Sequence, residues 1–121
     1  HSADEAMKTP AEQENERLAH IKDGVAMTKF IYWLKKNTGR IPHGRNQRVG
    51  LSWEAAHGPG GMHWPELCNI SAYGAHGAMC HYSATPESSI PLEPRGLYLI
   101  DSGGQYYEGT TDITRTLPWG L

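Results

Sequence analysis

The sequence has little excess charge and no long apolar run, and each shortage removes a class of function. Its 121 residues carry a formal net charge of −2, and neither acidic nor basic residues form a long run. A surface for nucleic acid or for a membrane is therefore not expected. The longest apolar run is only a few residues, which is too short for a transmembrane helix.

Cysteine is also scarce. Cys68 and Cys80 are the only two cysteines, too few for a disulfide framework, so a reduced, cytoplasmic setting is expected. The opening residues, HSADEAMKTP, lack the charged and apolar regions of a signal peptide. They do not begin with methionine, and we expect further sequence upstream.

The length and composition favour one small domain or part of one. A chain of 121 residues can bury a modest core but is small for a self-sufficient enzyme. Hydrophobic residues make up 38% of the chain and charged residues 20%, as in an ordinary soluble globular protein.

A long helix is predicted near the start of the chain, from Pro10 to about Asn37. Thr9 can cap this helix, Pro10 suits the first helical position, and Glu12 completes a capping box. The residues expected to form its buried face are Leu18, Ile21, Val25, Met27, Ile31 and Leu34.

Residues 40 to 66 show no clear repeat. Gly, Pro, His, Arg and Trp crowd together there without a period of 2 or 3.6 residues, which indicates a loop-rich segment. A short helix between Ser52 and His57 is compatible with the pattern. We predict that the region from Arg40 to Trp64 is the least ordered part of the chain.

Four short strands are predicted from Leu67 onward. The first two are LCNISAY and GAMCHY, separated by Gly74 to Gly77, and a proline-rich loop follows them. The next two form a hairpin, Leu97–Tyr106 and Thr110–Leu117, joined around Glu108-Gly109. A helix, an irregular segment and then a run of strands together predict an α+β fold with an antiparallel sheet.

Two carboxylates, Asp101 and Asp112, stand on the two strands of this hairpin. A two-residue turn at Glu108-Gly109 would pair Asp101 with Thr116 and put both acids on one face of the sheet. The acids would then be four residues apart along the strands, or roughly 13 Å, too far to share a metal pair. A β-bulge, or a wider turn, would bring them together. Because glycine tolerates the backbone of a bulge, we expect the bend at or near Gly103, Gly104 or Gly109.

Carboxylates placed close together point to a cation. They repel each other unless a cation or a proton lies between them. Divalent ions prefer carboxylate oxygens, and a dinuclear hydrolase needs acids that chelate one ion and bridge to the next. Asp101 and Asp112 are therefore candidate metal ligands. The alternative is that both are ordinary polar residues at strand ends, and their spacing alone does not choose between the two interpretations.

The amino-acid sequence of the hairpin is a more specific signal than the spacing of its two acids. The string LYLIDSGGQYYEGTTDITRT resembles the metal-binding hairpin of aminopeptidase P, the Xaa-Pro aminopeptidase family of pita-bread metallopeptidases. Upstream, KTPAEQENERLAHIKDGVAMTKFIYWL is similar to the first helix of that catalytic domain. ISAYGAHGAMCHYSATPESSIPLEPRG is similar to its strand pair and loop. The resemblance covers residues 7 to 36 and 69 to 118.

This resemblance implies a dinuclear metal site and a peptidase reaction. Asp101 and Asp112 match two of five ligands to a pair of divalent ions, most often manganese, with zinc or cobalt as alternatives. His81 matches a catalytic histidine beside the ions, which binds substrate and stabilises the transition state. A metal-bridging hydroxide would attack the bond between an N-terminal residue and a following proline. The substrates are then peptides with proline at the second position, and the parent protein is expected to be a homodimer.

The chain also departs from this family. The family's other ligands, one His and two Glu, belong to the second half of the domain, beyond Leu121. Residues 1 to 121 would thus be a partial catalytic domain, the N-terminal half of a pita-bread fold, whose partner is the missing C-terminal half. We expect it to be inactive alone. Residues 40 to 66 differ in composition from the charged helix that is usual there, and a frameshifted or misread stretch would explain the difference.

Three other interpretations stay open. A zinc set could be drawn from two histidines and both cysteines, although the spacing matches no compact zinc signature. A non-catalytic pita-bread binding module would keep the same fold, but the presence of both hairpin carboxylates argues against it. A prolidase acting on dipeptides is the third, and the wording of the hairpin favours aminopeptidase P over it. The residues of the zinc set are His57, His63, Cys68 and Cys80.

Other polar residues are assigned ordinary roles. His76 and Glu87 are expected to lie in loops, and Arg115 to pair with a nearby carboxylate. Cys80 precedes His81, so strand alternation would put it on the opposite face, where we expect it to be buried and inert.

Overall fold

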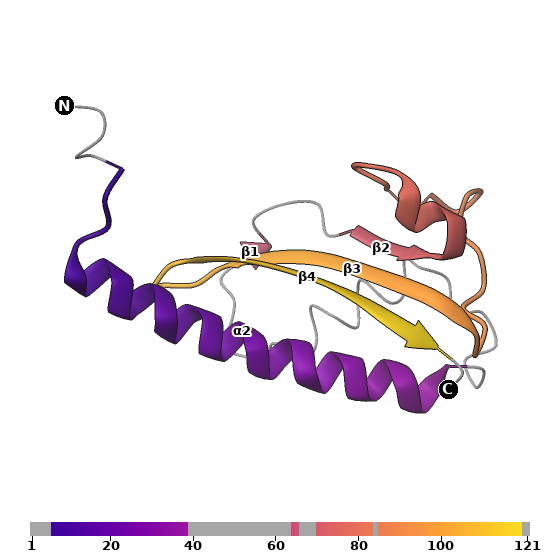
Figure 1. Ribbon diagram of the computed structural model, residues 1–121, viewed down its shortest axis with the longest axis horizontal. Coiled ribbons are helices and arrows are strands. Elements are labelled where there is room, and N and C mark those ends of the chain that lie inside the picture. Colours follow the sequence, from indigo (N-terminus) through magenta and orange to yellow (C-terminus); the bar gives the residue numbers. More distant parts are fainter. Residues whose placement is uncertain (1–5, 39–63, 66–69, 84, 120–121) are drawn as a thin grey trace.

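A long helix and a sheet make up most of the described structure. The computed structural model describes residues 6–38, 64–65, 70–83 and 85–119. Helix α2 (Pro10–Asn37) runs along one face of the sheet (Figure 1). The other elements are β1 (Trp64–Pro65), β2 (Ile70–Tyr73), the 3-10 helix η1 (Gly74–Ala78), β3 (Gly96–Gln105) and β4 (Thr110–Trp119).

Helix α2 begins as its sequence predicts. The Thr9 side chain accepts a hydrogen bond from the backbone N–H of Glu12 at 3.3 Å, and the Glu12 carboxylate accepts one from the backbone N–H of Thr9 at 2.6 Å. Pro10 occupies the first helical position, where its missing N–H removes no helical bond. The hydrogen bonds from Thr9 also lower the pKa of Glu12. The predicted bounds of the helix are confirmed.

The buried face of α2 differs from the predicted one. Leu18, Ile21 and Val25 are 42%, 63% and 50% exposed, so the prediction is wrong for these residues. At about 3.6 residues per turn, they lie on the side of the helix opposite to the buried residues. The helix therefore carries apolar residues on two sides. The sheet packs against the side that contains Ala19 and Ala26, whose small side chains allow close approach. The buried residues are Ala19, Asp23, Ala26, Met27, Phe30 and Leu34.

The core lies between α2 and the sheet. Phe30 and Leu34 pack with Tyr98 of β3 and Trp119 of β4, all of them buried. The rings of Tyr98 and Trp119 stack with their centroids 5.9 Å apart. The hydroxyl of Tyr98 shares a 2.9 Å hydrogen bond with Ser71 Oγ, so the polar end of this buried ring has a partner.

Strand β3 is the central strand of the sheet. It pairs antiparallel with β4 along one edge and with β2 and β1 along the other. The predicted α+β fold and its hairpin are confirmed, with bounds that differ by one or two residues. Figure 1 shows α2 on one side of the sheet and the segment containing η1 on the other.

The predicted strand GAMCHY is wrong. Gly74 has a φ of 59° and turns the chain out of the sheet into η1. The chain then turns again through Cys80 and His81, and His81 has a left-handed φ of 58° that no strand residue adopts. Cys80 is a free, exposed cysteine, so the prediction that it is buried is also wrong.

Several predictions concern residues that the structure does not describe. Most of the region from Arg40 to Trp64, including the short helix expected between Ser52 and His57, lies outside the described ranges. Within those ranges, no helix is long and apolar enough to cross a membrane.

Replacing Phe30 by alanine should destabilise the fold far more than the same change at Tyr32. Phe30 is 1% exposed and Tyr32 is 66% exposed on the same helix. Truncating a buried phenylalanine typically costs about 3–5 kcal/mol, whereas a surface change costs about 0.5 kcal/mol or less. Urea unfolding of the two variants measures the difference, and equal losses would contradict this assignment of the buried face.

Candidate metal centre

The two hairpin carboxylates project from one face of the sheet as neighbours. Asp101 is paired with Thr114, and Asp112 is paired with Gly103. Residues that face each other across a ladder share a face, as do residues two apart on one strand. Asp101 and Asp112 are thus diagonal neighbours, and such positions are roughly 7–8 Å apart.

The turn is centred on Tyr107-Glu108, one residue earlier than the sequence suggested, and this shift, and not a β-bulge, brings the two acids together. Gln105 pairs with Thr110, so the loop holds four residues, 106–109, and not the two considered from the sequence. The backbone N–H of Tyr106 donates to the carbonyl oxygen of Gly109 at 2.8 Å and closes this loop. The ladder is continuous from Gly96 to Gln105, so the bend expected at Gly103 or Gly104 is absent from the described strands.

Neighbouring side chains suit this face to a hard cation. Thr114 donates a 2.6 Å hydrogen bond to Asp101 Oδ1 and orients that half-buried carboxylate. Gly103, opposite Asp112, has no side chain that could come between the two carboxylates. Carboxylate oxygens are the donors that hard divalent ions take. The donor set therefore fits a divalent ion.

The two faces of the sheet differ in what covers them. Tyr98 and Ile100 point toward α2 and belong to the core. Leu99 and Asp101 alternate with them and point to the other face. On that face η1 packs over the sheet, because a Cβ at Gly77 would lie 3.6 Å from Leu99 Cβ. The acids therefore lie on the face that α2 leaves uncovered.

His81 lies on the exposed turn after η1. A left-handed φ is uncommon for a residue other than glycine and is found most often where function or a tight turn requires it. The next residue, Tyr82, stacks on His76, with the ring centroids 4.8 Å apart. Within the described ranges, no three His, Cys, Asp or Glu side chains gather closely enough to hold an ion. Asp101, Asp112 and His81 are therefore not a complete metal site by themselves.

Other residues singled out in the sequence lie elsewhere. Arg115 donates to the carbonyl oxygen of Thr114 at 2.7 Å, where a carboxylate partner was expected. Glu87 lies in an exposed turn, as expected, and backbone and Thr85 hydrogen bonds lower its pKa. Of the zinc set, only Cys80 falls within the described residues. The other three members are His57, His63 and Cys68.

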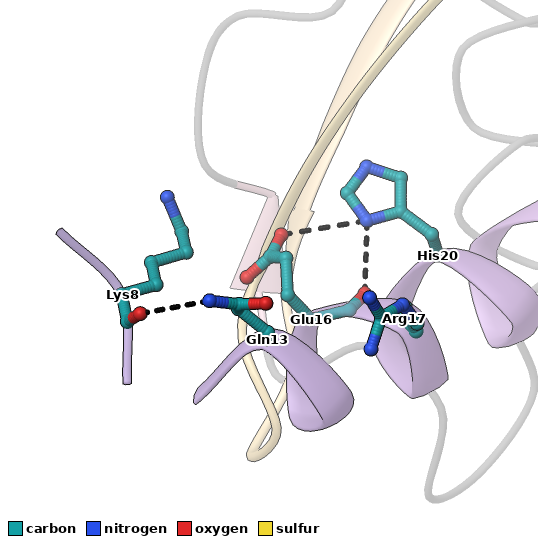
Figure 2. Close-up of a pocket in the computed structure, with 5 residues that line it drawn as sticks. All are labelled: Lys8, Gln13, Glu16, Arg17 and His20. Atoms are coloured by element: carbon teal, nitrogen blue, oxygen red, sulfur yellow. Dashed lines mark hydrogen bonds and ion pairs between the residues drawn. The ribbon is translucent and has the colours of Figure 1, made fainter. Parts of the chain in front are cut away.

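A surface hollow lies at the N-terminal end of α2 (Figure 2), and neither Asp101 nor Asp112 is among the residues that line it. Its side chains contact one another: His20 Nδ1 is 3.4 Å from a Glu16 carboxylate oxygen and 3.0 Å from the Glu16 carbonyl oxygen. Side-chain pairs four residues apart are common on exposed helices. The hollow shows no catalytic arrangement. It is lined by Lys8, Gln13, Glu16, Arg17 and His20.

The sequence model of metallopeptidase family M24 matches residues 14–120, and the chain belongs to this family. The chain is 39% identical over 118 residues to Xaa-Pro aminopeptidase 2 of Mus musculus. It is 40% identical over 119 residues to the Sus scrofa protein of the same name. Each match covers 95% of this chain and 17% of the relative, so the chain spans a small part of the length of these relatives.

Solved structures agree with this family. An X-prolyl aminopeptidase from Caenorhabditis elegans, described as a cytosolic enzyme with a di-nuclear active site, matches with a TM-score of 0.87 and 28% identity. The match covers 96% of this chain and 19% of that one. A variant of Escherichia coli aminopeptidase P matches with a TM-score of 0.72 and 26% identity, over 92% of this chain and 23% of that one. The predicted pita-bread architecture, a long helix followed by an antiparallel sheet, is confirmed.

Sequence reasoning missed the role of Thr114. The alternation of threonines in TTDITRT was the available signal, because residues two apart on a strand share a face. The pairing of Thr114 with Asp101 becomes evident only once the register of the hairpin is known.

Replacing Thr114 by valine should weaken divalent metal binding. The change keeps the shape of the side chain but removes the hydroxyl that donates to Asp101. Loss of such an outer partner typically lowers metal affinity by about 10–100-fold. Calorimetric titration with Mn²⁺ measures the effect. Thr116→Val changes the next threonine on the same face and should leave affinity unaltered, whereas equal losses in both variants would contradict a specific role for Thr114.

Proposed function

We propose that this chain supplies part of the dinuclear metal centre of an Xaa-Pro aminopeptidase. The observation that carries the proposal is the placement of Asp101 and Asp112 as diagonal neighbours on one face, with Thr114 orienting the first. The family membership and the Xaa-Pro aminopeptidases among the similar proteins support it. The di-nuclear active site of the Caenorhabditis elegans protein supports a pair of ions.

Asp101 and Asp112 would hold two divalent ions, and we propose Mn²⁺ because both donors are hard oxygens. Bound ions supply an acidified water and polarise the carbonyl that is attacked. Two carboxylates cannot complete two coordination shells, so one His and two Glu from outside residues 1–121 would join them. The isolated chain would then be inactive, because the ions stay mostly hydrated and the substrate is not held in place.

His81 would act on the substrate as a hydrogen-bonding residue. Its exposed position, on the turn after η1, leaves the imidazole accessible to a bound peptide. An imidazole aimed at the carbonyl would stabilise the negative charge that develops there in the transition state. The substrates would be peptides with proline at the second position. The parent protein would be a cytoplasmic homodimer, and the remaining half of the domain would be the immediate partner of this chain.

The complete protein should release the N-terminal residue from an Xaa-Pro peptide in the presence of Mn²⁺, and a chelator should abolish this activity. Asp101→Asn and Asp112→Asn should each lower kcat by at least about 100-fold, beyond the usual effect of an outer-shell change. Glu93→Gln, at an exposed acid, is the matched control. A metal-loaded complete protein without activity would favour the binding-module alternative, and activity of residues 1–121 alone would refute the ligand argument.

His81→Asn should lower kcat while leaving metal affinity unchanged. Asparagine tolerates the left-handed backbone found at His81, so the turn should be retained. Loss of a catalytic side chain that acts in the transition state typically costs about 10²–10⁴-fold. Peptide cleavage and Mn²⁺ titration measure the two effects. His20→Asn, on the exposed part of α2, serves as the control, and full activity of His81→Asn would refute the catalytic role.

A further inference from the structure

The loop between β3 and β4 rests on α2, on the side of the sheet away from the candidate metal ligands. Tyr106 opens this loop, and its hydroxyl donates to Asp23 Oδ1 at 3.0 Å. Asp23 is 0% exposed and lies 83 residues earlier in the chain. A carboxylate is rarely buried completely, because burial is costly unless hydrogen bonds offset it. The Asp23–Tyr106 contact is therefore a specific link between the helix and the hairpin.

Two further contacts hold the same loop. Lys22 forms an ion pair with Glu108, and this hydrogen bond lowers the pKa of the Glu108 carboxyl. Gly109 lies so close to α2 that a Cβ there would collide with the Glu16 carboxylate and lie 3.5 Å from Glu16 Cα. Figure 2 shows Glu16 on α2 with the hairpin behind it. Three of the four loop residues thus contact one short stretch of the helix.

The Tyr106 hydroxyl stays protonated and can donate a hydrogen bond to Asp23. Burial raises its pKa, and the negative charge of Asp23 raises it further. The hydroxyl therefore keeps its proton at neutral pH and continues to donate. Hydrogen bonds with a charged partner are stronger than those between neutral groups, so this contact can restrain the loop.

The position of the turn sets the separation of the two acids. With four loop residues, Asp101 is opposite Thr114 and Asp112 is opposite Gly103. A two-residue turn at Glu108-Gly109 would move the partner of Asp101 to Thr116 and add two residues to the separation along the strands. Whatever keeps the turn centred on Tyr107-Glu108 therefore keeps the acids as neighbours.

We propose that Asp23 and Tyr106 are positioning residues for the metal centre: their hydrogen bond anchors the four-residue loop on α2 and so holds Asp112 beside Asp101. This inference rests on the metal site proposed above. Neither residue touches an ion or the substrate, because both act on the α2 side of the sheet. Their effect reaches the carboxylates through the register of β3 and β4.

The test uses the complete protein that contains this chain, loaded with Mn²⁺, and the variant Tyr106→Phe. Calorimetry should show that the second Mn²⁺ binds about 10-fold more weakly, the lower end of the range for outer-shell changes. The electron paramagnetic resonance spectrum should lose the coupling between two Mn²⁺ ions that the wild type shows. Asp23→Asn keeps an oxygen that accepts from Tyr106 and should retain the coupling. Tyr107→Phe makes the same change at the adjacent tyrosine, which is 85% exposed, and should alter neither readout.

If Asp23 and Tyr106 only stabilise the fold and do not position the metal ligands, a different result is expected. Tyr106→Phe would then unfold at a lower temperature but keep the wild-type Mn²⁺ affinity and the coupled spectrum, and that outcome overturns the proposal. If Tyr106→Phe does not fold, Asp23→Ala removes the acceptor without leaving a buried carboxylate, and the same two readouts decide. A wild-type protein that binds no pair of Mn²⁺ ions would instead refute the metal site itself, and the positioning role with it.

Discussion

Pairing of β3 with β4 in one particular register is the interaction on which the candidate metal centre depends. In that register Asp101 lies opposite Thr114 and Asp112 lies opposite the bare backbone of Gly103. A slip of one residue would turn one acid to the other face of the sheet. A slip of two residues to the Asp101–Thr116 pairing would keep the face but place the carboxylates four residues apart along the strands, too far to share an ion. The separation of the two candidate metal ligands is therefore fixed by the register of the hairpin.

The two faces of the sheet have different roles. One face carries Tyr98, Ile100 and Trp119 and packs on α2, where burial of apolar surface stabilises the fold. The other face carries the two acids and the threonine that orients one of them. Because side chains alternate along a strand, a single pair of strands can contribute to a core on one face and to the candidate metal site on the other. Helix α2 thus packs on the face of the sheet opposite the two acids and contributes no side chain to the candidate site.

Two carboxylates also explain why the described structure holds no complete ion site. Each divalent ion needs about six ligands, and a dinuclear centre needs donors that bridge. The relatives named above are much longer than this chain, which matches only 17% of their length. Remaining donors would come from outside residues 1–121, and the exposure of Asp112 is compatible with a second group of ligands closing over this face.

By itself, the sequence determined the features that depend on neighbouring residues. The capping box of Thr9 and Glu12, the bounds of α2 and the two strands of the hairpin all follow from contacts or alternation within a few residues. The hairpin motif also indicated the family. Tertiary structure decided which side of α2 is buried, because both sides carry apolar residues and only the sheet selects between them. It also replaced the strand expected at GAMCHY with η1 and a turn, and it set the position of the turn after Gln105. The turn is joined to α2 by a contact between Asp23 and Tyr106, 83 residues apart, and no local pattern encodes a contact between residues so far apart in the chain.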